Sequence, residues 1–260
     1  MKVSIIIPVY NEHRTFHQVM DRVRLAALPP GCSKEIIVVD DGSTDGTGQM
    51  ISEYMRTGEV AGCRSASNAG KGAAIRKGIE LASGDVVLIQ DGDLEYDPND
   101  YARLIDPILS GQAEIVYGSR FLGHGERGHF SRRQDGMALR NQIANWILTI
   151  TSNLLYSAGI TDEATAYKAF RTSILRGLPL SCRRFEFCPE VTAKLRRLGY
   201  RIHEVPISYN ARGIADGKKI RARDGFQAWW TLVKYRFTPR HTLIREGTDV
   251  AVQPLPDPRG

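Results

Sequence analysis

The chain has 260 residues, of which 42% are hydrophobic and 25% charged, and its formal net charge is +6. These values exclude a disordered or fibrous protein and suit one large folded domain with a buried core. No run approaches the roughly 20 apolar residues of a membrane-spanning helix, and the apolar run at the start is too short for a signal peptide. We therefore expect a cytoplasmic protein that at most docks peripherally on the inner face of a membrane.

The first half of the chain alternates between strand and helix patterns. Apolar runs, mostly rich in β-branched residues, predict strands at residues 3–9, 35–39, 62–66, 85–90 and 115–118. Helical spacing of apolar residues predicts helices at residues 12–27, 49–55 and 73–83. This alternation predicts an α/β fold, a doubly wound and mostly parallel sheet that binds its ligands at the carboxyl ends of its strands.

After Arg120 the pattern changes. Polar, glycine-rich and basic segments predict loops at residues 123–136 and 213–223. Between and after them, the patterns predict helices at residues 138–157, 190–198 and 226–237 and a strand at residues 202–209. We expect one domain over residues 1–240, with a nucleotide-sugar-binding half at 1–120, an acceptor-side half at 121–240 and a flexible tail at 241–260.

Charge is concentrated in one zone. Residues 194–223 hold nine Lys or Arg against two acidic residues, a local charge of +7. Such a zone predicts a phosphate, anionic-lipid or nucleic-acid partner, or else a solvated basic face. We do not expect nucleic acid, because the chain has no recognisable binding motif for it. The four cysteines show no CxxC spacing and no histidine at zinc-finger distance, which predicts free thiols and no structural zinc.

Two acidic clusters follow predicted strands. Asp91, Asp93 and Glu95 alternate directly after one strand, and Asp40 and Asp41 directly after another. Either cluster alone is typical of a turn that caps a helix. Together, at neighbouring carboxyl ends, they predict an oxygen-lined site for Mg²⁺ or Mn²⁺ and for substrate phosphates or ribose hydroxyls.

Longer motifs carry a family resemblance. In chain order they are Pro8-Val9-Tyr10-Asn11-Glu12, Val39-Asp40-Asp41-Gly42-Ser43-Thr44-Asp45-Gly46-Thr47, Asn68-Ala69-Gly70-Lys71-Gly72 and Asp91-Gly92-Asp93. This order resembles a family 2 inverting glycosyltransferase of the GT-A fold. Segments at residues 161–171, 185–190 and 204–209 resemble the branch that transfers a hexose to polyprenyl or dolichyl phosphate.

The resemblance implies roles for individual residues. The donor, a UDP- or GDP-hexose, would be bound by Pro8, Tyr10, Glu12, Asp40, Asp41, Lys71, Asp91 and Gly92. The metal, Mg²⁺ or Mn²⁺, would be held by Asp91, Asp93 and Glu95. The acceptor phosphate would be met by Arg120, by Arg132 or Arg133, and by Lys168 and Arg171. The catalytic set would be Asp93, Arg120, Arg133 and Lys168.

The acceptor remains open at this stage. An alcohol acceptor needs a carboxylate base, for which Asp162, Glu163 and Glu186 are candidates, whereas a phosphate acceptor is already ionised. The abundance of cations after Arg120 favours a polyprenyl phosphate. The alternatives are a soluble saccharide or natural-product hydroxyl and a noncatalytic nucleotide-sugar-binding module.

Two helical segments bear on partners. Residues 226–237 combine aromatic with basic side chains and predict either a bilayer-interface helix or ordinary core packing. Residues 143–156 predict an interfacial helix or a homodimer contact.

Overall fold

The computed structural model describes residues 1–122, 139–211 and 222–248. Its strands form a seven-stranded sheet in the order β3-β2-β1-β4-β6-β5-β7. The strand bounds are β1 Lys2–Val9, β2 Ser33–Asp40, β3 Ala61–Arg64, β4 Val86–Ile89, β5 Ile115–Ser119, β6 Lys168–Arg171 and β7 His203–Pro206. Neighbouring strands pair in parallel except at β6, which is antiparallel to both β4 and β5. The predicted mostly parallel α/β sheet is therefore confirmed.

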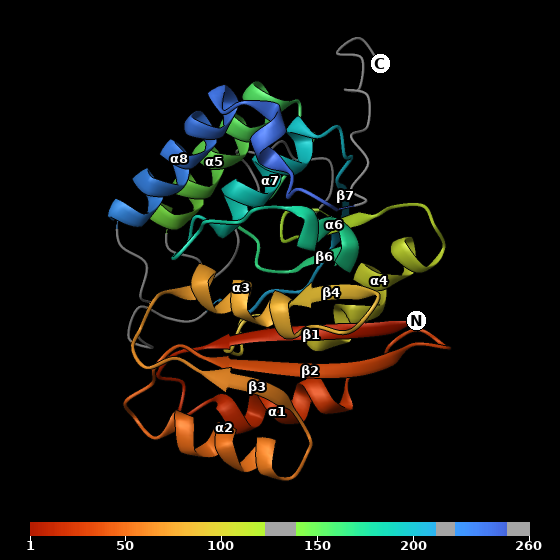
Figure 1. Cartoon of the computed structure of the whole chain (residues 1–260), viewed down its shortest axis with the longest axis vertical. Helices are drawn as coiled ribbons and strands as arrows, with labels where there is room; N and C mark the ends of the chain where they lie inside the picture. Colours follow the sequence, from red (N-terminus) through yellow and green to blue (C-terminus); the bar gives the residue numbers. More distant parts are fainter. Residues whose placement is uncertain (123–138, 212–221, 249–260) are drawn as a thin grey trace.

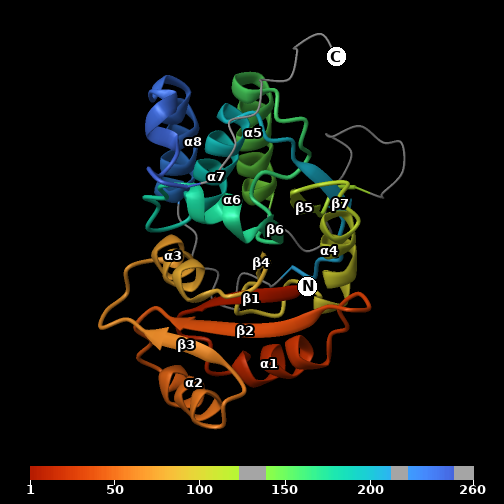
Figure 2. The same cartoon turned by 45° about the vertical axis from the view of Figure 1, so that its right-hand side comes forward.

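Helices cover both faces of this sheet (Figures 1 and 2). Their bounds are α1 Phe16–Leu25, α2 Thr47–Arg56, α3 Lys71–Leu81, α4 Tyr101–Leu109, α5 Leu139–Tyr156, α6 Thr172–Gly177, α7 Phe187–Arg197 and α8 Ala222–Phe237, with short 3₁₀ turns at Pro98–Asp100 and Arg240–Leu243. Alternate residues of β1 point to opposite faces, so Ile5 and Ile7 pack in the core beneath α1 and α4, while Ile6 packs in the core beneath α3. Burial on both faces explains why β1 reads as an unbroken apolar run.

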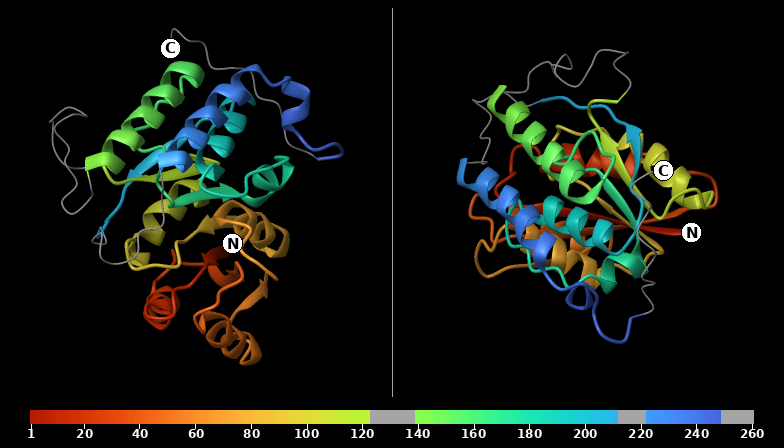
Figure 3. Two further views of the ribbon diagram at one scale, coloured as in Figure 1. Left: turned by 90° about the vertical axis from the view of Figure 1, so that its left-hand side faces the viewer. Right: turned by 90° about the horizontal axis from the view of Figure 1, so that it is seen from above.

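The helices of the second half form an outer layer. α5 and α8 run side by side and both pack on α7, as the views in Figures 1 and 3 agree. Leu148 of α5 and Leu232 of α8 belong to the core that also contains Ile75 of α3. None of the helices in the described parts of the chain is long and apolar enough to cross a membrane.

Several element boundaries differ from the sequence predictions. The first helix begins at Phe16 rather than at residue 12, because Asn11 adopts a left-handed conformation (φ 53°) and its side chain accepts a hydrogen bond from the backbone N–H of Thr44. α4 and α6 were not predicted. Two residues of the segment predicted as a tail from residue 241 contact the folded domain: Leu243 is fully buried, and the Arg245 N–H donates to the carbonyl of Gly177.

Candidate active site

A large cavity lies at the carboxyl ends of the parallel strands. Its volume is about 1250 Å³, and its walls include segments that follow β1, β2, β3, β4 and β5. The opposite wall is formed by α5, by the loop at residues 181–186 and by α8. Parallel strands end at the same edge of the sheet, so the motifs that the sequence singled out converge there.

The donor side of the cavity includes Pro8, Tyr10, Glu12 and Asp41. The Asp41 carboxylate accepts hydrogen bonds from the backbone N–H groups of Ala69 and Gly70, at 2.9 and 2.7 Å. It thereby holds the loop that begins α3 against the end of β2.

Asp40 does not lie in the cavity wall. Successive side chains of a strand point to opposite faces, and the Asp40 carboxylate turns away to accept the N–H of Ser43 at 2.8 Å and to pair with Arg64 at 3.1 Å. Its side chain is buried against Gly48, where an added Cβ would lie 2.7 Å from Asp40 Oδ2. The prediction that Asp40 binds the donor is therefore not supported by this geometry; Asp40 shapes the turn after β2.

The Asp91–Glu95 turn follows β4 and lines the cavity at Asp91, Gly92, Asp93 and Glu95. The Lys71 ammonium, at the start of α3, forms an ion pair with Asp91 Oδ1. Asp93 Oδ1 accepts the backbone N–H of Glu95 at 3.1 Å, which stabilises the turn. An added Cβ at Gly92 would lie 3.0 Å from the carbonyl oxygen of Pro8, so the close approach of β1 favours glycine there.

These residues fit a divalent cation only in part. The carboxylates of Asp91 and Asp93 line one cavity and offer the oxygen ligands that Mg²⁺ and Mn²⁺ prefer. Among the described residues, however, no three His, Cys, Asp or Glu side chains are grouped closely enough to hold a metal by themselves. Glu95, predicted as a third ligand, accepts a hydrogen bond from the Tyr209 hydroxyl at 2.9 Å. The arrangement suits a cation shared between Asp91, Asp93 and the phosphate oxygens of a ligand.

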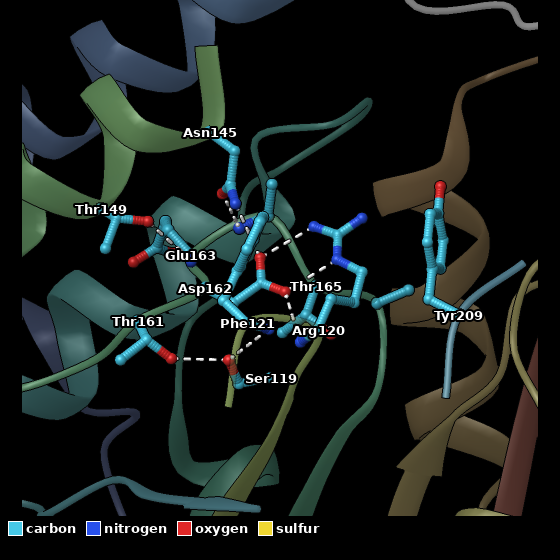
Figure 4. A network of polar contacts seen from close by, with 12 residues as sticks. Ser119, Arg120, Phe121, Asn145, Thr149, Thr161, Asp162, Glu163, Thr165 and Tyr209 are labelled. Atoms are coloured by element: carbon cyan, nitrogen blue, oxygen red, sulfur yellow. Dashed lines mark hydrogen bonds and ion pairs between the residues drawn. The ribbon is translucent and has the colours of Figure 1, made fainter. Parts of the chain in front are cut away.

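Arg120 enters the cavity wall from the end of β5 and is held by a buried network (Figure 4). Its Nε and Nη2 donate to the two carboxylate oxygens of Asp162 at 2.7 and 2.8 Å, and its guanidinium lies 4.9 Å from the centre of the Tyr209 ring. The Asn145 amide also donates to Asp162, at 2.9 Å. Burial alone would raise the pKa of Asp162, but the charge and hydrogen bonds of Arg120 outweigh it and hold that pKa below its usual value.

Lys168 is fully buried and does not line the cavity. Its ammonium donates to the carbonyl of Glu163 at 3.1 Å and lies 3.4 Å from the centre of the Tyr117 ring. Glu163 is also fully buried, and its carboxylate accepts hydrogen bonds from Ser152 and Thr192. Burial raises the pKa of Glu163 to about 7, because Lys168 and these hydroxyls offset only part of the desolvation.

The remaining predicted acceptor contacts are separated in space. Arg171 pairs with Val86 at the start of β4, the end of the sheet opposite to Asp91, and its guanidinium donates to the carbonyl of Ile108. Lys168 and Arg171 are the first and last residues of β6, and the antiparallel pairing with β4 places Lys168 beside Ile89, at the end of the sheet near Asp91. Arg171 is therefore removed from the candidate acceptor site. Arg132 and Arg133 lie outside the described residues.

Sequence reasoning missed part of the cavity wall. The carbonyls of Arg184 and Arg183 accept the N–H groups of Gly72 and Ala73, which fixes the loop at residues 181–186 over the start of α3. Arg184 pairs with the buried Asp224 of α8 at 3.3 Å. Within the segment at residues 185–190, which carried a resemblance, only Glu186 was given a role, as a candidate base, so the pattern indicated this region but not its contacts.

Comparisons with known proteins agree with this arrangement. The family model described as "Glycosyl transferase family 2" matches residues 4–178. A curated relative, the polyprenol monophosphomannose synthase of Mycolicibacterium smegmatis, is 31% identical over 84% of this chain and 80% of that protein. The dolichol-phosphate mannosyltransferase of Pyrococcus furiosus is 30% identical over 84% of this chain, and the dodecaprenyl-phosphate galacturonate synthase of Rhizobium johnstonii is 27% identical over 82%. The chain spans only 59% and 60% of the lengths of these last two proteins.

Solved structures share the fold at low sequence identity. Glucosyl-3-phosphoglycerate synthase of Mycobacterium tuberculosis, in complex with Mn²⁺, uridine diphosphate and glucosyl-3-phosphoglycerate, aligns with a TM-score of 0.66 at 20% identity over 92% of this chain and 81% of that chain. Mannosyl-3-phosphoglycerate synthase of Rubrobacter xylanophilus aligns with a TM-score of 0.65 at 18% identity over 90% and 72%.

The family match over residues 4–178, together with the fold shared with these solved structures, makes the chain a glycosyltransferase of the GT-A fold. The chain belongs to glycosyl transferase family 2, and its curated relatives include members of the polyprenyl-phosphate sugar branch.

Proposed function

We propose that this protein transfers a hexose, with inversion, from a UDP- or GDP-sugar to a polyprenyl phosphate. The observation that carries the proposal is the continuity of the cavity. The same space is lined by Lys71 and Asp91 at one side and by Leu148 of α5 and Trp230 of α8 at another. The charged side chains suit a nucleotide diphosphate, and the apolar side chains that α5 and α8 contribute to the wall suit a lipid chain.

Carboxylates considered as bases for an alcohol acceptor have other partners. Asp162 is bound to Arg120, and Glu163 is buried among hydroxyl groups. Glu186 lines the cavity, but its two oxygens accept the backbone N–H groups of Arg183 and Arg184 at 2.7 and 3.1 Å. An ionised phosphate needs no base, only cations that position it. This supports the phosphate acceptor over an alcohol.

The reaction follows from charge. An oxygen of the acceptor phosphate forms a bond to the anomeric carbon, the bond from that carbon to the donor diphosphate breaks, and the nucleoside diphosphate leaves with the electron pair. Lys71 and Arg120 stabilise the negative charges that the two phosphate groups bring into the cavity. A divalent cation bound by Asp91 and Asp93 would add Lewis-acid stabilisation of the departing diphosphate. Relatives named for mannosyl transfer make mannose the first sugar to test, with glucose second.

The test is a transfer assay with labelled UDP- and GDP-hexoses. With a polyprenyl phosphate and Mn²⁺ we expect label to enter the organic phase. The same lipid as a free polyprenol should give none. Asp93→Ala should abolish transfer, whereas Asp106→Ala, at an exposed position of α4, should not. Label that reaches only water-soluble saccharides would refute the lipid acceptor, and full activity with EDTA would refute the cation.

A further inference from the structure

The large hydrophobic side chains that the described residues expose are unevenly distributed. Eight of twelve lie on α5 and α8, although these helices contribute only 18 and 16 residues. They form what we call the α5/α8 face, made of Leu139, Ile143, Trp146, Ile147, Leu154, Phe226, Trp230 and Phe237. The two helices lie side by side in the outer layer (Figure 3), so these side chains all belong to two neighbouring helices. Apolar surface concentrated in this way marks an interaction site.

The spacing shows that this face is separate from the core. On α8, Phe226, Trp230 and Phe237 recur at intervals of four and seven residues, while Ala228 and Leu232 on another side of the helix are buried. The exposed fractions are 67% for Phe226 and 81% for Phe237, so neither side chain contributes much to the fold. These aromatic groups need a partner outside the described chain.

Charge identifies the partner. α5 contains no acidic residue, and the one acidic residue of α8, Asp224, is buried and paired with Arg184. The exposed charges on the two helices are therefore basic, and they are Arg140, Arg223, Lys234 and Arg236. Exposed aromatic side chains beside basic ones match the interface of an anionic bilayer. A second copy of the same face would bring like charges together.

We infer that the α5/α8 face docks on an anionic lipid bilayer, with its aromatic and aliphatic side chains in the headgroup boundary and its basic residues on the phosphates. The inference rests on the proposed function, because a lipid acceptor is what would make docking on a bilayer useful. The cavity is lined by Ala144 and Leu148 of α5 and by Ala228 of α8, next to this face. A lipid acceptor could thus enter the cavity from the bilayer on which the protein sits.

Vesicle co-sedimentation of the full chain tests the inference. The vesicles are phosphatidylcholine alone or phosphatidylcholine with phosphatidylglycerol. We expect binding to the anionic vesicles, weakened at least tenfold by Ile143→Ser with Phe226→Ser, because each change removes a large apolar anchor. The matched control is Leu25→Ser, since Leu25 is 85% exposed on α1, across the sheet (Figure 1), and this change should leave binding unaltered. Arg223→Gln should weaken binding about fivefold on anionic vesicles only.

Other outcomes overturn the inference. An equal loss of vesicle binding in Leu25→Ser would show that any exposed apolar side chain contributes to binding. The α5/α8 face would instead be a subunit contact if the wild type did not bind vesicles and eluted as a dimer, while the Ile143→Ser, Phe226→Ser variant eluted as a monomer. Transfer to a short, water-soluble polyprenyl phosphate separates this test from that of the proposed function. The double variant should keep that activity, and an inactive wild type that still binds vesicles would refute only the proposed function.

Discussion

The buried pair of Arg120 and Asp162 offers the sharpest test of the site's construction. Asp162 accepts four hydrogen bonds, from the backbone N–H, Nε and Nη2 of Arg120 and from the Asn145 amide, at 2.7 to 3.1 Å. Asp162→Asn keeps the side-chain shape but turns an amide N–H donor toward the N–H donors of Arg120 and Asn145. It also removes the counter-charge of the Arg120 side chain, which is only 7% exposed. Loss of one partner of a buried ion pair costs about 3–5 kcal/mol.

Urea unfolding measures this cost, and a fall in Tm of roughly 10 °C should accompany it. Because Arg120 lines the cavity, its displacement should also lower kcat/KM for transfer about 100-fold. The control is Asp106→Asn on exposed α4, which should change the unfolding free energy by less than about 0.5 kcal/mol. If Asp162→Asn is no more destabilising than this control, the buried pair does not hold Arg120 as described.

Three further changes probe other parts of the structure. Glu163 has a folded-state pKa of about 7, raised above its ordinary value of 4.5. As pH rises from 4.5 to 7 this carboxyl ionises in the unfolded chain before it does so in the folded one, so the wild type should lose roughly 3 kcal/mol of stability. Glu163→Gln should remove this loss from urea curves taken across that range. Gly78→Ala should destabilise the protein by about 1–3 kcal/mol, because the new Cβ on α3 would lie 2.3 Å from Ile6 Cγ2. Gly225→Ala on α8 has open space around the new Cβ and should be neutral or stabilising by up to about 1 kcal/mol. Equal effects of the two changes on the unfolding free energy would contradict the packing of α3 on β1. Lys71→Ala should raise KM for the nucleotide-sugar about tenfold or more with little change in Tm, and an unchanged KM would remove Lys71 from the donor site.

The donor half could be predicted well from the sequence. Apolar runs followed by Asp40-Asp41 or by Gln90-Asp91 encode both a buried strand and the place where its ligands must lie. The pattern could not decide between Asp40 and Asp41, because the face on which each carboxylate lies depends on the pleat of β2.

The acceptor half could be predicted less well. β6 was not predicted, since its four residues begin and end with basic side chains and resemble an exposed segment. Lys168 is instead buried against Tyr117, a tertiary contact that compensates the ammonium and leaves no trace in the local sequence. Arg171 was predicted at the acceptor site for the same reason. Only the antiparallel pairing of β6 with β4 shows that Arg171 lies at the far end of the sheet.

In the proposed reaction, the new bond joins the sugar to a phosphate oxygen of a lipid acceptor. Phosphorus NMR of the purified product tests it most directly. We expect the monoester signal of the polyprenyl phosphate to be replaced by a diester signal coupled to the anomeric proton, with the configuration inverted relative to the donor. A product whose lipid phosphate is still a monoester, with the sugar on a hydroxyl group, would contradict it.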